Sequence, residues 1–528
     1  KDVSYHMVIS DNHLVNASIK KGDPNTPKET GIMVERCTNV TIKNNLVANI
    51  SKTTTIGGYG IVVRESSARV ENNTIVNVLD GMLIIYSHSE VVDNTILETT
   101  NDGLIIGRGT TGFAVGNEIN RSEYGYYYAR RGLDVDSDLP FLYANNTIRN
   151  YVHGIDEGGV GQTLIDNRVV YAQNGMIVRG VNGTFINNTV TADRKGLHLG
   201  RAVNATYRGN TFLGCEVDVY DGDWDYVDEH DLDTSNTLDG KPILIWRGVN
   251  DRVVPEGWGQ VVLSRCENIT MRDESASGSW GGLIAGFSKG VNVERLNMPS
   301  TIKAEVRFHR TEDYMVANCS FENITLWTDG EHMGMNETCR GTFSNNTLVN
   351  GWMYVRYISN TTIVGNTIIS DDAWGINAWV VGPTSIVDND VTILSPHSGS
   401  CAIGIGTEGY SRISGNTLHR NGIEIRGTEE EMRAYDFPDD NTLDGKTIIY
   451  RKDSTSQTYD DTYGQIILVS CDNFTIDGFD PTTGNIGTLL GFCTDGIIRN
   501  CTFDGPSHTG IHSTGCDGIS VIYSSFMG

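Results

Sequence analysis

One spacing recurs through this sequence and limits the folds that the chain can adopt. Two series of residues keep it, one of glycines that precede alternating apolar residues and one of asparagines that precede apolar runs. The glycines step by 21, 22, 29, 22, 21 and 21 residues, at Gly60, Gly81, Gly103, Gly132, Gly154, Gly175 and Gly196. The asparagines step by 21, 23, 29, 21, 21 and 22, at Asn73, Asn94, Asn117, Asn146, Asn167, Asn188 and Asn210. Both series lengthen to 29 at the tyrosine-rich segment around Tyr124–Tyr128, which indicates a structural repeat.

A period near 22 residues predicts an all-β right-handed parallel β-helix, because it is the length of one coil of short strands and turns. The LxxLxL pattern of leucine-rich repeats is missing. A single coil cannot bury its own apolar side chains, so coils must stack at about 4.8 Å. We expect the glycines at turns with positive φ and the asparagines in a hydrogen-bonded ladder between coils. The asparagine series resumes at Asn323, Asn346, Asn366, Asn389 and Asn416.

A second repeat divides the chain. Residues 236–273 (NTLDGKPI…) align without a gap on residues 441–478 (NTLDGKTI…), at an offset of 205. We therefore predict tandem β-helical modules over 1–235, 236–440 and 441–528, the last of them shorter. The polar, acidic stretches 221–235 and 428–440 are expected to be exposed connections.

Composition and charge exclude two classes of partner. The net charge is −26 and the isoelectric point is near 4.8, so no basic stripe is present to neutralise nucleic-acid phosphates. No apolar stretch approaches twenty residues, and we expect no membrane span. The chain begins at Lys1 without a leader peptide, which leads us to expect a processed or trimmed extracellular product.

The ten cysteines are even in number and form no CxxC pair, which favours disulfides in an oxidising compartment over a zinc site. Cys319 and Cys339 are about one coil apart, and Cys493, Cys501 and Cys516 form a cluster; these five are the expected disulfide cysteines. The alternative is that they are buried thiols stacked inside the solenoid.

Seventeen Asn-x-Ser/Thr sequons permit N-glycosylation of a surface protein, although the same motif suits a turn that enters a strand. The candidate glycosylation sites are Asn39, Asn72, Asn145, Asn187, Asn268, Asn323, Asn345, Asn473 and Asn500.

These features resemble a known family. The Asn-rich coils, with the NTLDGKPI…GQVVL…CENIT unit between them, are similar to pectate-lyase-like β-helix repeat proteins that archaea, methanogens in particular, place on their surfaces. The resemblance covers nearly the whole chain. Together with a mass of 57.9 kDa, it implies a subunit of an archaeal sheath or surface layer.

Motifs for catalysis are not assembled in the sequence. The WxDH and RxPxxR signatures of pectate lyases are absent, and Asp371-Asp372 is not followed by the GHG or RxK motifs of polygalacturonases. Asp388 and Asp390 lie one coil later and could add to a carboxylate patch, but polar residues at a β-helix turn are the favoured explanation for them. We therefore expect no enzyme activity, no catalytic residue and no organic cofactor.

The densest acidic run could bind calcium through oxygen ligands, or it could be a solvated linker. Its carboxylates are Asp218, Asp221, Asp223, Asp225 and Asp228. The run lacks the glycine and the terminal glutamate of an EF-hand loop. A smaller run contains Asp134, Asp136 and Asp138.

Three functions are considered; we predict the first, with the other two as alternatives. The first is a structural subunit that assembles with copies of itself outside the cell by pairing the edges of its coils. The second is a carbohydrate-binding or adhesive surface protein, in which aromatic side chains stack on sugars of cell-surface glycans. The aromatic candidates are Tyr124, Tyr126, Tyr127, Tyr128, Trp352 and Tyr354. The third is a polysaccharide lyase or hydrolase, which would need two or three carboxylates converging in a groove.

Overall fold

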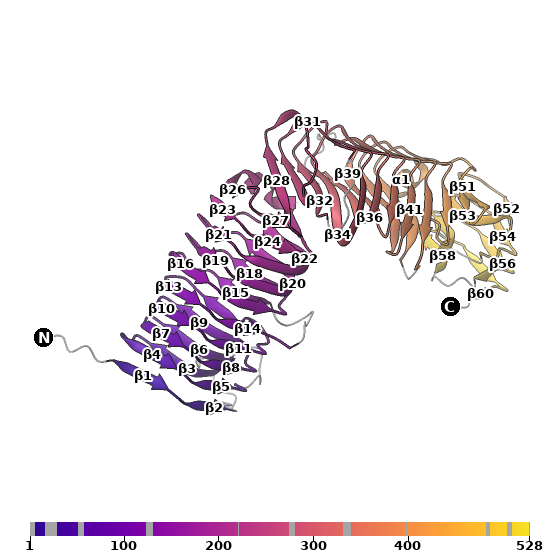
Figure 1. Cartoon of the computed structure of the whole chain (residues 1–528). Helices are drawn as coiled ribbons and strands as arrows, with labels where there is room; N and C mark the ends of the chain where they lie inside the picture. Colours follow the sequence, from indigo (N-terminus) through magenta and orange to yellow (C-terminus); the bar gives the residue numbers. More distant parts are fainter. Residues whose placement is uncertain are drawn as a thin grey trace. The chain divides into compact units, whose positions relative to one another are not determined.

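A computed structural model describes residues 6–15, 29–50, 58–122, 130–219, 221–273, 280–330, 339–395, 399–481, 486–503 and 509–526. The chain is a right-handed parallel β-helix with 62% of its residues in strands and 3% in helices, which confirms the predicted fold class. It divides into two compact units (Figure 1). Unit 1 comprises Lys1–Ile245 and Trp258–Val261, and unit 2 comprises Trp246–Gly257 and Val262–Gly528.

Unit 1 stacks its coils in three rows of parallel strands. The first row is β1 (Met7–Ser10), β4 (Val40–Lys43), β7 (Ser67–Glu71), β10 (His88–Val92), β13 (Thr111–Val115), β16 (Phe141–Ala144), β19 (Thr163–Ile165), β21 (Thr184–Ile186), β23 (Ala205–Arg208) and β26 (His230–Leu232). The second row is β2 (His13–Val15), β5 (Leu46–Ala48), β8 (Thr74–Val76), β11 (Thr95–Leu97), β14 (Glu118–Asn120), β17 (Thr147–Arg149), the first parts of β20 (Arg168–Val178) and β22 (Thr189–Leu199), β24 (Thr211–Leu213) and β27 (Thr237–Leu238). The third row is β3 (Glu29–Glu35), β6 (Gly58–Arg64), β9 (Asp80–Ile85), β12 (Leu104–Ile106), β15 (Arg131–Val135), β18 (His153–Glu157), the last parts of β20 and β22, and β25 (Glu216–Val219).

Unit 2 repeats this plan. Its first row is β29 (Asn250–Val253), β31 (Glu267–Arg272), β33 (Asn292–Glu294), β35 (Tyr314–Ala317), β37 (Gly341–Ser344), β40 (Thr361–Val364), β43 (Thr384–Val387), β46 (Ser411–Ser414) and β49 (Tyr435–Asp436). Its second row includes β38 (Thr347–Val349), β41 (Thr367–Ser370), β44 (Asp390–Ile393), β47 (Thr417–His419) and β50 (Thr442–Leu443). Its third row is β32 (Gly282–Gly286), the last parts of β34 (Asn297–His309) and β36 (Ser320–Asp329), β39 (Met353–Ile358), β42 (Trp374–Val380), β45 (Cys401–Thr407) and β48 (Ile423–Arg426), while the first parts of β34 and β36 belong to the second row. The last coils contain β51 (Lys446–Lys452), β53 (Tyr463–Val469), β55 (Ile486–Gly491) and β58 (Thr509–Thr514), and beside them β52 (Thr458–Tyr459), β54 (Thr475–Asp477), β56 (Ile497–Arg499) and β59 (Ser520–Ile522).

The core consists of columns of identical or similar apolar side chains. In the second row of unit 1, in-register pairing stacks one branched residue of each coil on the next, and all are almost completely buried. This column is Ile75, Ile96, Ile119, Ile148, Val169 and Val190. Burying each side chain contributes roughly 1.5–3 kcal/mol, so the repeat of β-branched residues is the main stabilising term.

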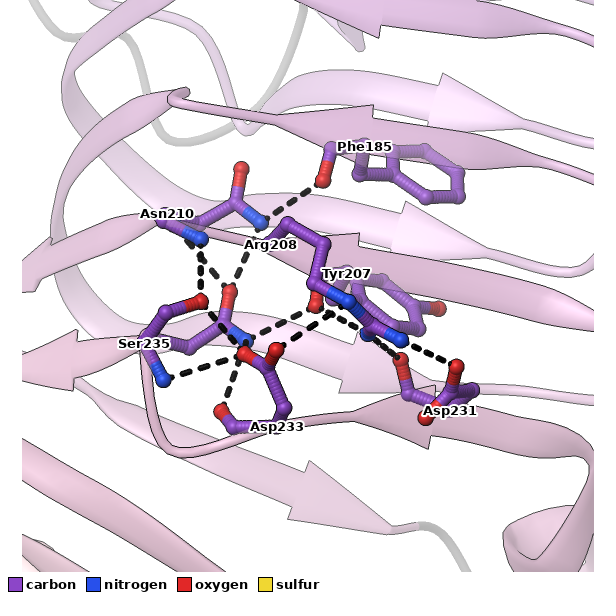
Figure 2. A network of polar contacts seen from close by, with 9 residues as sticks. Phe185, Tyr207, Arg208, Asn210, Asp231, Asp233 and Ser235 are labelled. Atoms are coloured by element: carbon purple, nitrogen blue, oxygen red, sulfur yellow. Dashed lines mark hydrogen bonds and ion pairs between the residues drawn. The ribbon is translucent and has the colours of Figure 1, made fainter.

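The predicted asparagine ladder is present. In unit 1 the backbone N–H and the side-chain Nδ2 of each asparagine donate to Oδ1 of the asparagine in the next coil. Nδ2 also donates to a carbonyl of the preceding coil, as from Asn188 to Leu164 at 2.9 Å. Figure 2 shows this bond for Asn210 and the carbonyl of Phe185. The ladder runs through Asn12, Asn45, Asn73, Asn94, Asn117, Asn146, Asn167, Asn188, Asn210 and Asn236.

Unit 2 has a shorter ladder, of Asn346, Asn366, Asn389, Asn416 and Asn441. The prediction that Asn323 begins it is wrong. Cys319 takes that place, and its backbone N–H donates to Oδ1 of Asn346 at 3.0 Å. Asn323 lies four residues further on, within β36, and its side chain donates to the carbonyl of Ser300.

The periodic glycines do not have the positive φ that we predicted. They lie within or beside strands of the third row of unit 1, where the coils approach most closely. A Cβ added to Gly154 would lie 2.6 Å from the carbonyl oxygen of Gly175 and 2.3 Å from Cγ1 of Val169. Steric exclusion therefore selects glycine here. The left-handed turns are instead taken largely by asparagine and aspartate, such as Asn72 and Asn145.

The two NTLDGK segments adopt the same structure. Each reverses the chain in a short antiparallel pair, β27 with β28 (Lys241–Arg247) and β50 with β51. Further on, a buried glutamine side chain bonds both backbone groups of one residue in the preceding coil. Gln260 does so with Val217 at 2.7 and 2.7 Å, and Gln465 with Ile423 at 2.8 and 2.7 Å. The three-module division itself stays a prediction.

The two acidic stretches are more ordered than the exposed connections that we predicted. The first contains the 3-10 helix η1 (Asp221–Glu229), in which Trp224 and Val227 are buried. Arg208 lies between Asp231 and Asp233 there (Figure 2). The second contains helix α1 (Glu429–Arg433), with Thr428 and Glu431 as a capping box and Met432 buried. Apolar residues within polar segments explain the difference.

Candidate functional site

The outward side of the third row in unit 2 carries aromatic and charged residues, and we call it the aromatic face. In-register pairing brings together residues from strands β36 to β48, although these span about a hundred positions of the sequence. One column is Trp327, Tyr354, Asn377, Gly404 and Glu424, and its neighbour is Asp329, Arg356, Trp379, Gly406 and Arg426.

Trp379 is the exposed centre of the aromatic face. Its side chain is 39% exposed, which is unusual for tryptophan within a strand. The next coil has Gly406 at the paired position, and a Cβ there would lie 3.0 Å from the indole ring. The indole therefore packs against the backbone of Gly406 and occupies the space that a side chain at this position would take.

Arg426 continues this column. Its guanidinium lies 5.4 Å from the ring centre of Trp374 and 5.5 Å from that of Trp379. Nε and one terminal nitrogen donate to the two carboxylate oxygens of Glu424 at 2.7 and 2.6 Å, a bidentate pair that raises the pKa of Arg426. These contacts fix the guanidinium in place while 35% of the side chain stays accessible.

Two cavities meet at Arg426. The first, of about 140 Å³, is lined by Tyr357, Trp379, Gly406, Glu408, Arg426 and Glu431 among others. The second, of about 220 Å³, is lined by Glu424, Arg426, Met432, Leu489, Leu490 and His512 among others. Arg426 and Gly427 line both cavities, and the other lining residues come from several coils. We call the two cavities together the Trp379 groove.

The Trp379 groove has the composition of a sugar-binding site. One flat aromatic ring is available for the C–H face of a pyranose, and charged side chains at the rim can bond hydroxyl groups. Glu408 is exposed, and the Arg426–Glu424 pair presents planar donors and acceptors. Because the groove crosses successive coils, it suits an extended chain better than a single small molecule.

Carboxylates converge on the third row of unit 1 instead, on the outward side, which we call the ionic face. Arg131 donates to Asp102 at 2.7 Å and pairs with Asp134 at 2.8 Å. Asp134 is paired in register with Asp156 of the next coil, whose carboxylate bonds Arg179. The sequence analysis singled out only Asp134 of these residues.

Burial raises the pKa of Asp134 to about 7, with Asp102 and Asp156 adding repulsion and Arg131 opposing the shift. On the inward side of β18, burial also raises the pKa of Glu157 to about 7, against hydrogen bonds from the backbone of Gly180 and Gly159. Glu157 is therefore not part of the ionic face. A carboxyl group with such a pKa exchanges its proton near neutral pH, as acid catalysts do. The ionic face is therefore the place where the enzymatic alternative is to be tested.

The predicted calcium ligands lie at the end of this face. Asp218 is fully buried in β25, with an oxygen 2.6 Å from Nζ of Lys195, and Asp223 accepts from Nε of Arg201 at 2.9 Å. Asp225 and Asp228 lie on η1, and the side chain of Asp221 is outside the described residues. Within the described ranges, no three His, Cys, Asp or Glu side chains gather as a metal site. Calcium binding by this run stays a prediction.

The disulfide candidates fall at different corners of the coils. Cys319 follows strand β35 and Cys339 precedes strand β37, so they lie at opposite ends of paired strands. The predicted Cys319–Cys339 pair does not fit this arrangement. Cys493 and Cys516 lie in adjacent coils at one corner, where the backbone N–H of Cys493 donates to Sγ of Cys516 at 3.3 Å. Cys501 lies elsewhere, with its N–H donating to Ser524.

All nine candidate glycosylation asparagines have positive φ, between 50° and 58°. Each takes a left-handed position, mostly at a corner of a coil, and all except the half-buried Asn323 are exposed. The turn geometry alone accounts for asparagine at these positions. Glycosylation stays a prediction.

The other candidates are placed as follows. Trp352 and Tyr354 are half-buried in the aromatic face, where Tyr354 contacts Trp327 edge-on at 4.9 Å. The tyrosines at 124 and 126–128 lie outside the described residues. Asp371 and Asp372 follow strand β41, and Asp372 accepts from the backbone of Ala373. Asp388 and Asp390 precede or begin β44, with Asp390 near His419 at 3.4 Å, so the four do not form one patch.

Sequence reasoning missed Trp379, Arg426 and Glu424. Each is ordinary in its local sequence, and only the register of strands 20 to 27 residues apart brings them together. The absence of a side chain at Gly404 and Gly406, in the run CAIGIGT, is the one local signal that a strand there leaves space above it.

Among the comparisons with known proteins, the family model agrees with the fold. A family model described as a right-handed beta helix region matches residues 30–156. A search of curated proteins found no match. A solved structure described as a complex of alginate lyase AlyF-OU02 with G6 matches at 10% identity, over 88% of this chain and 79% of that chain, with a TM-score of 0.20. None of the helices in the described ranges has the length and hydropathy to cross a membrane.

Proposed function

We propose that the protein is an extracellular β-helix that binds a glycan chain in the Trp379 groove. The observation that supports this is an exposed tryptophan over a glycine, next to a fixed Arg–Glu pair and two cavities that share Arg426. No catalytic step is part of the proposal, and the glycan is a partner rather than a substrate.

Replacing Trp379 by alanine is expected to weaken glycan binding at least tenfold, because the apolar surface for sugar stacking is lost. A tenfold change corresponds to about 1.4 kcal/mol, within what one buried aromatic contact provides. Retardation in gels that contain a panel of neutral and acidic polysaccharides measures the affinity. Tyr410→Ala is the matched control, since Tyr410 is 56% exposed on unit 2 but does not line the groove.

Two results would contradict the proposal. One is equal binding by wild type, Trp379→Ala and Tyr410→Ala. The other is release of reducing or unsaturated ends from a polysaccharide. Loss of that activity in Asp134→Asn would place catalysis on the ionic face, and its loss in Asp371→Asn or Asp372→Asn would place it at the turn after β41.

We also propose self-assembly into a sheath or surface layer, which a separate observation favours. The first described coil exposes Met7, Val8 and Val15 at 41%, 50% and 46%, and the last exposes Val521, Ile522 and Tyr523 at 42% or more. A coil stacked on either would bury these side chains and pair its strands. A second copy of the chain supplies both surfaces.

A proline at Val521 together with a lysine at Ile522 is expected to abolish filaments or sheets of the purified protein, because β59 loses a donor and gains a charge. Electron microscopy at high protein concentration measures the assembly. A lysine at the exposed Val253 in β29 is the control for the added charge. Undiminished assembly of the β59 variant, or a monomeric wild type, would exclude stacking through this strand.

A further inference from the structure

Three cysteines stack in successive coils at one corner of unit 2. The paired neighbours Asp472, Thr494 and Asp517 fix the register, and each directly follows one of Cys471, Cys493 and Cys516. The thiol of Cys493 contacts the thiols on both sides. Coils stack at about 4.8 Å, within the Cα separation of about 4.4–6.8 Å that disulfides use.

The chain contains a second copy of this corner for comparison. At the offset of 205 residues, Cys266, Ser288 and Thr311 correspond to Cys471, Cys493 and Cys516. Cys266 N–H donates to Oγ of Ser288 at 3.1 Å, just as Cys493 N–H donates to Sγ of Cys516 at 3.3 Å. Ser288 and Thr311 bond the carbonyls of Gly286 and His309, and the thiols of Cys493 and Cys516 bond the equivalent carbonyls.

This comparison distinguishes the hydrogen bonds that build the corner from the reactivity that the thiols add. Hydroxyl side chains meet the hydrogen-bonding requirements of the second and third positions of the corner in the first copy, and Ser66 and Ser87 do the same in unit 1, where Cys37 stands at the first position. Three thiols in a row are therefore not needed to build the corner. What sulfur adds over oxygen is reaction with another sulfur.

The three cysteines of the stack differ in how accessible their thiols are to solvent. Cys471 and Cys493 are fully buried, whereas Cys516 is half-buried. The hydrogen bond with Cys493 lowers the pKa of Cys516 to about 6, and the same effect acts on Cys471. Cys516 is thus the thiol that a small molecule can reach, and its thiolate is the reactive form.

We propose that Cys471, Cys493 and Cys516 form a thiol–disulfide exchange site that reacts with a low-molecular-mass disulfide. The thiolate of Cys516 attacks the small disulfide RSSR, forms a mixed disulfide and releases RS⁻, which takes a proton from water. Cys493 passes its proton to the neighbouring thiolate of Cys471 and attacks the sulfur of Cys516. The bond between Cys516 and the small molecule breaks, the second RS⁻ leaves and is protonated by water, and the Cys493–Cys516 disulfide closes. Two protein thiols are oxidised and one RSSR is reduced to two RSH.

The third thiol, that of Cys471, gives the disulfide a second position in the stack. Attack of Cys471 on the sulfur of Cys493 moves the disulfide to Cys471–Cys493 and frees Cys516. Only one disulfide forms at a time, because Cys493 belongs to both pairs. Cys501, which stacks on Ser524, takes no part.

The test incubates the full chain with oxidised glutathione and maps its disulfides by mass spectrometry. Wild type is expected to lose two thiols of this stack and to gain one disulfide that contains Cys493. Cys493→Ser is expected to stop at a glutathione adduct on Cys516. Cys516→Ser is expected to react at least tenfold more slowly, because the accessible thiol is gone. Cys501→Ser is the control and should match wild type.

Circular dichroism verifies that each variant keeps the β-helix, and Cys266 in the first copy is an internal control that should stay a thiol. Retention of all three thiols in wild type would overturn the proposal. So would a disulfide that includes Cys501, or equal product from wild type and Cys493→Ser.

Discussion

Replacing Asn188 by alanine is expected to lower the free energy of unfolding of unit 1 by about 3–5 kcal/mol, because several buried groups lose their partners together. Oδ1 of Asn188 accepts from the backbone N–H and from Nδ2 of Asn167, both at 3.0 Å. Its Nδ2 donates to Leu164 and Asn210 at 2.9 and 3.0 Å. Alanine leaves these donors and acceptors inside the solenoid, where water does not reach them.

Urea denaturation followed by circular dichroism measures this effect, and the adjacent Asn187 provides the control. Asn187 is exposed and has a φ of 53°, which glycine adopts without strain. Asn187→Gly should therefore change the free energy of unfolding by less than about 1 kcal/mol. Similar losses in both variants would mean that the ladder is not a main source of stability.

Replacing Gly154 by alanine is expected to destabilise unit 1 by about 2–4 kcal/mol, since the new methyl group overlaps Val169 and the backbone of Gly175. The control is Gly214→Ala. Gly214 has a φ of 64° and nothing within 4 Å of the added Cβ, so only the left-handed backbone opposes alanine there, at about 1–2 kcal/mol.

The order of the two glycine variants, measured by the same urea titration, decides between two reasons for glycine in the repeat. A larger loss at Gly154 follows from close contact between coils. A larger loss at Gly214 would restore the explanation by positive φ, which the structure does not support for Gly154.

The sequence predicted the fold because every coil meets the same environment, so Asn73 and Asn188 repeat one signal at one interval. It did not predict why Gly154 is glycine, since the clash is with Val169 and Gly175 in neighbouring coils and depends on exact register. A pattern of spacing reports that a position is constrained, but it does not say which neighbour constrains it.

The candidate sites show the same limit. Cys319 and Cys339 are 20 residues apart and lie at different corners, whereas Cys493 and Cys516 are 23 apart and share one. Coil length varies, so separation along the chain does not identify a corner. Continuing the alignment of the NTLDGK segments at the same offset of 205 residues would have found the thiol stack, because that offset places Cys493 opposite Ser288. Nothing comparable marks Trp379, whose partners contact it only after the coils are stacked.

The repeated chain reversal at Asn236 and Asn441 has a consequence for how such chains change length. Gln260 bonds both backbone groups of Val217, and Gln465 bonds both backbone groups of Ile423 in the same way. Each glutamine is therefore able to make these two bonds with the coil that precedes the other NTLDGK segment. Unequal recombination between the two gene segments would delete or duplicate 205 residues. The contact between an NTLDGK segment and the coil before it would stay of the same kind. A protein built in this way can lengthen or shorten during evolution by whole modules, each inserted in register.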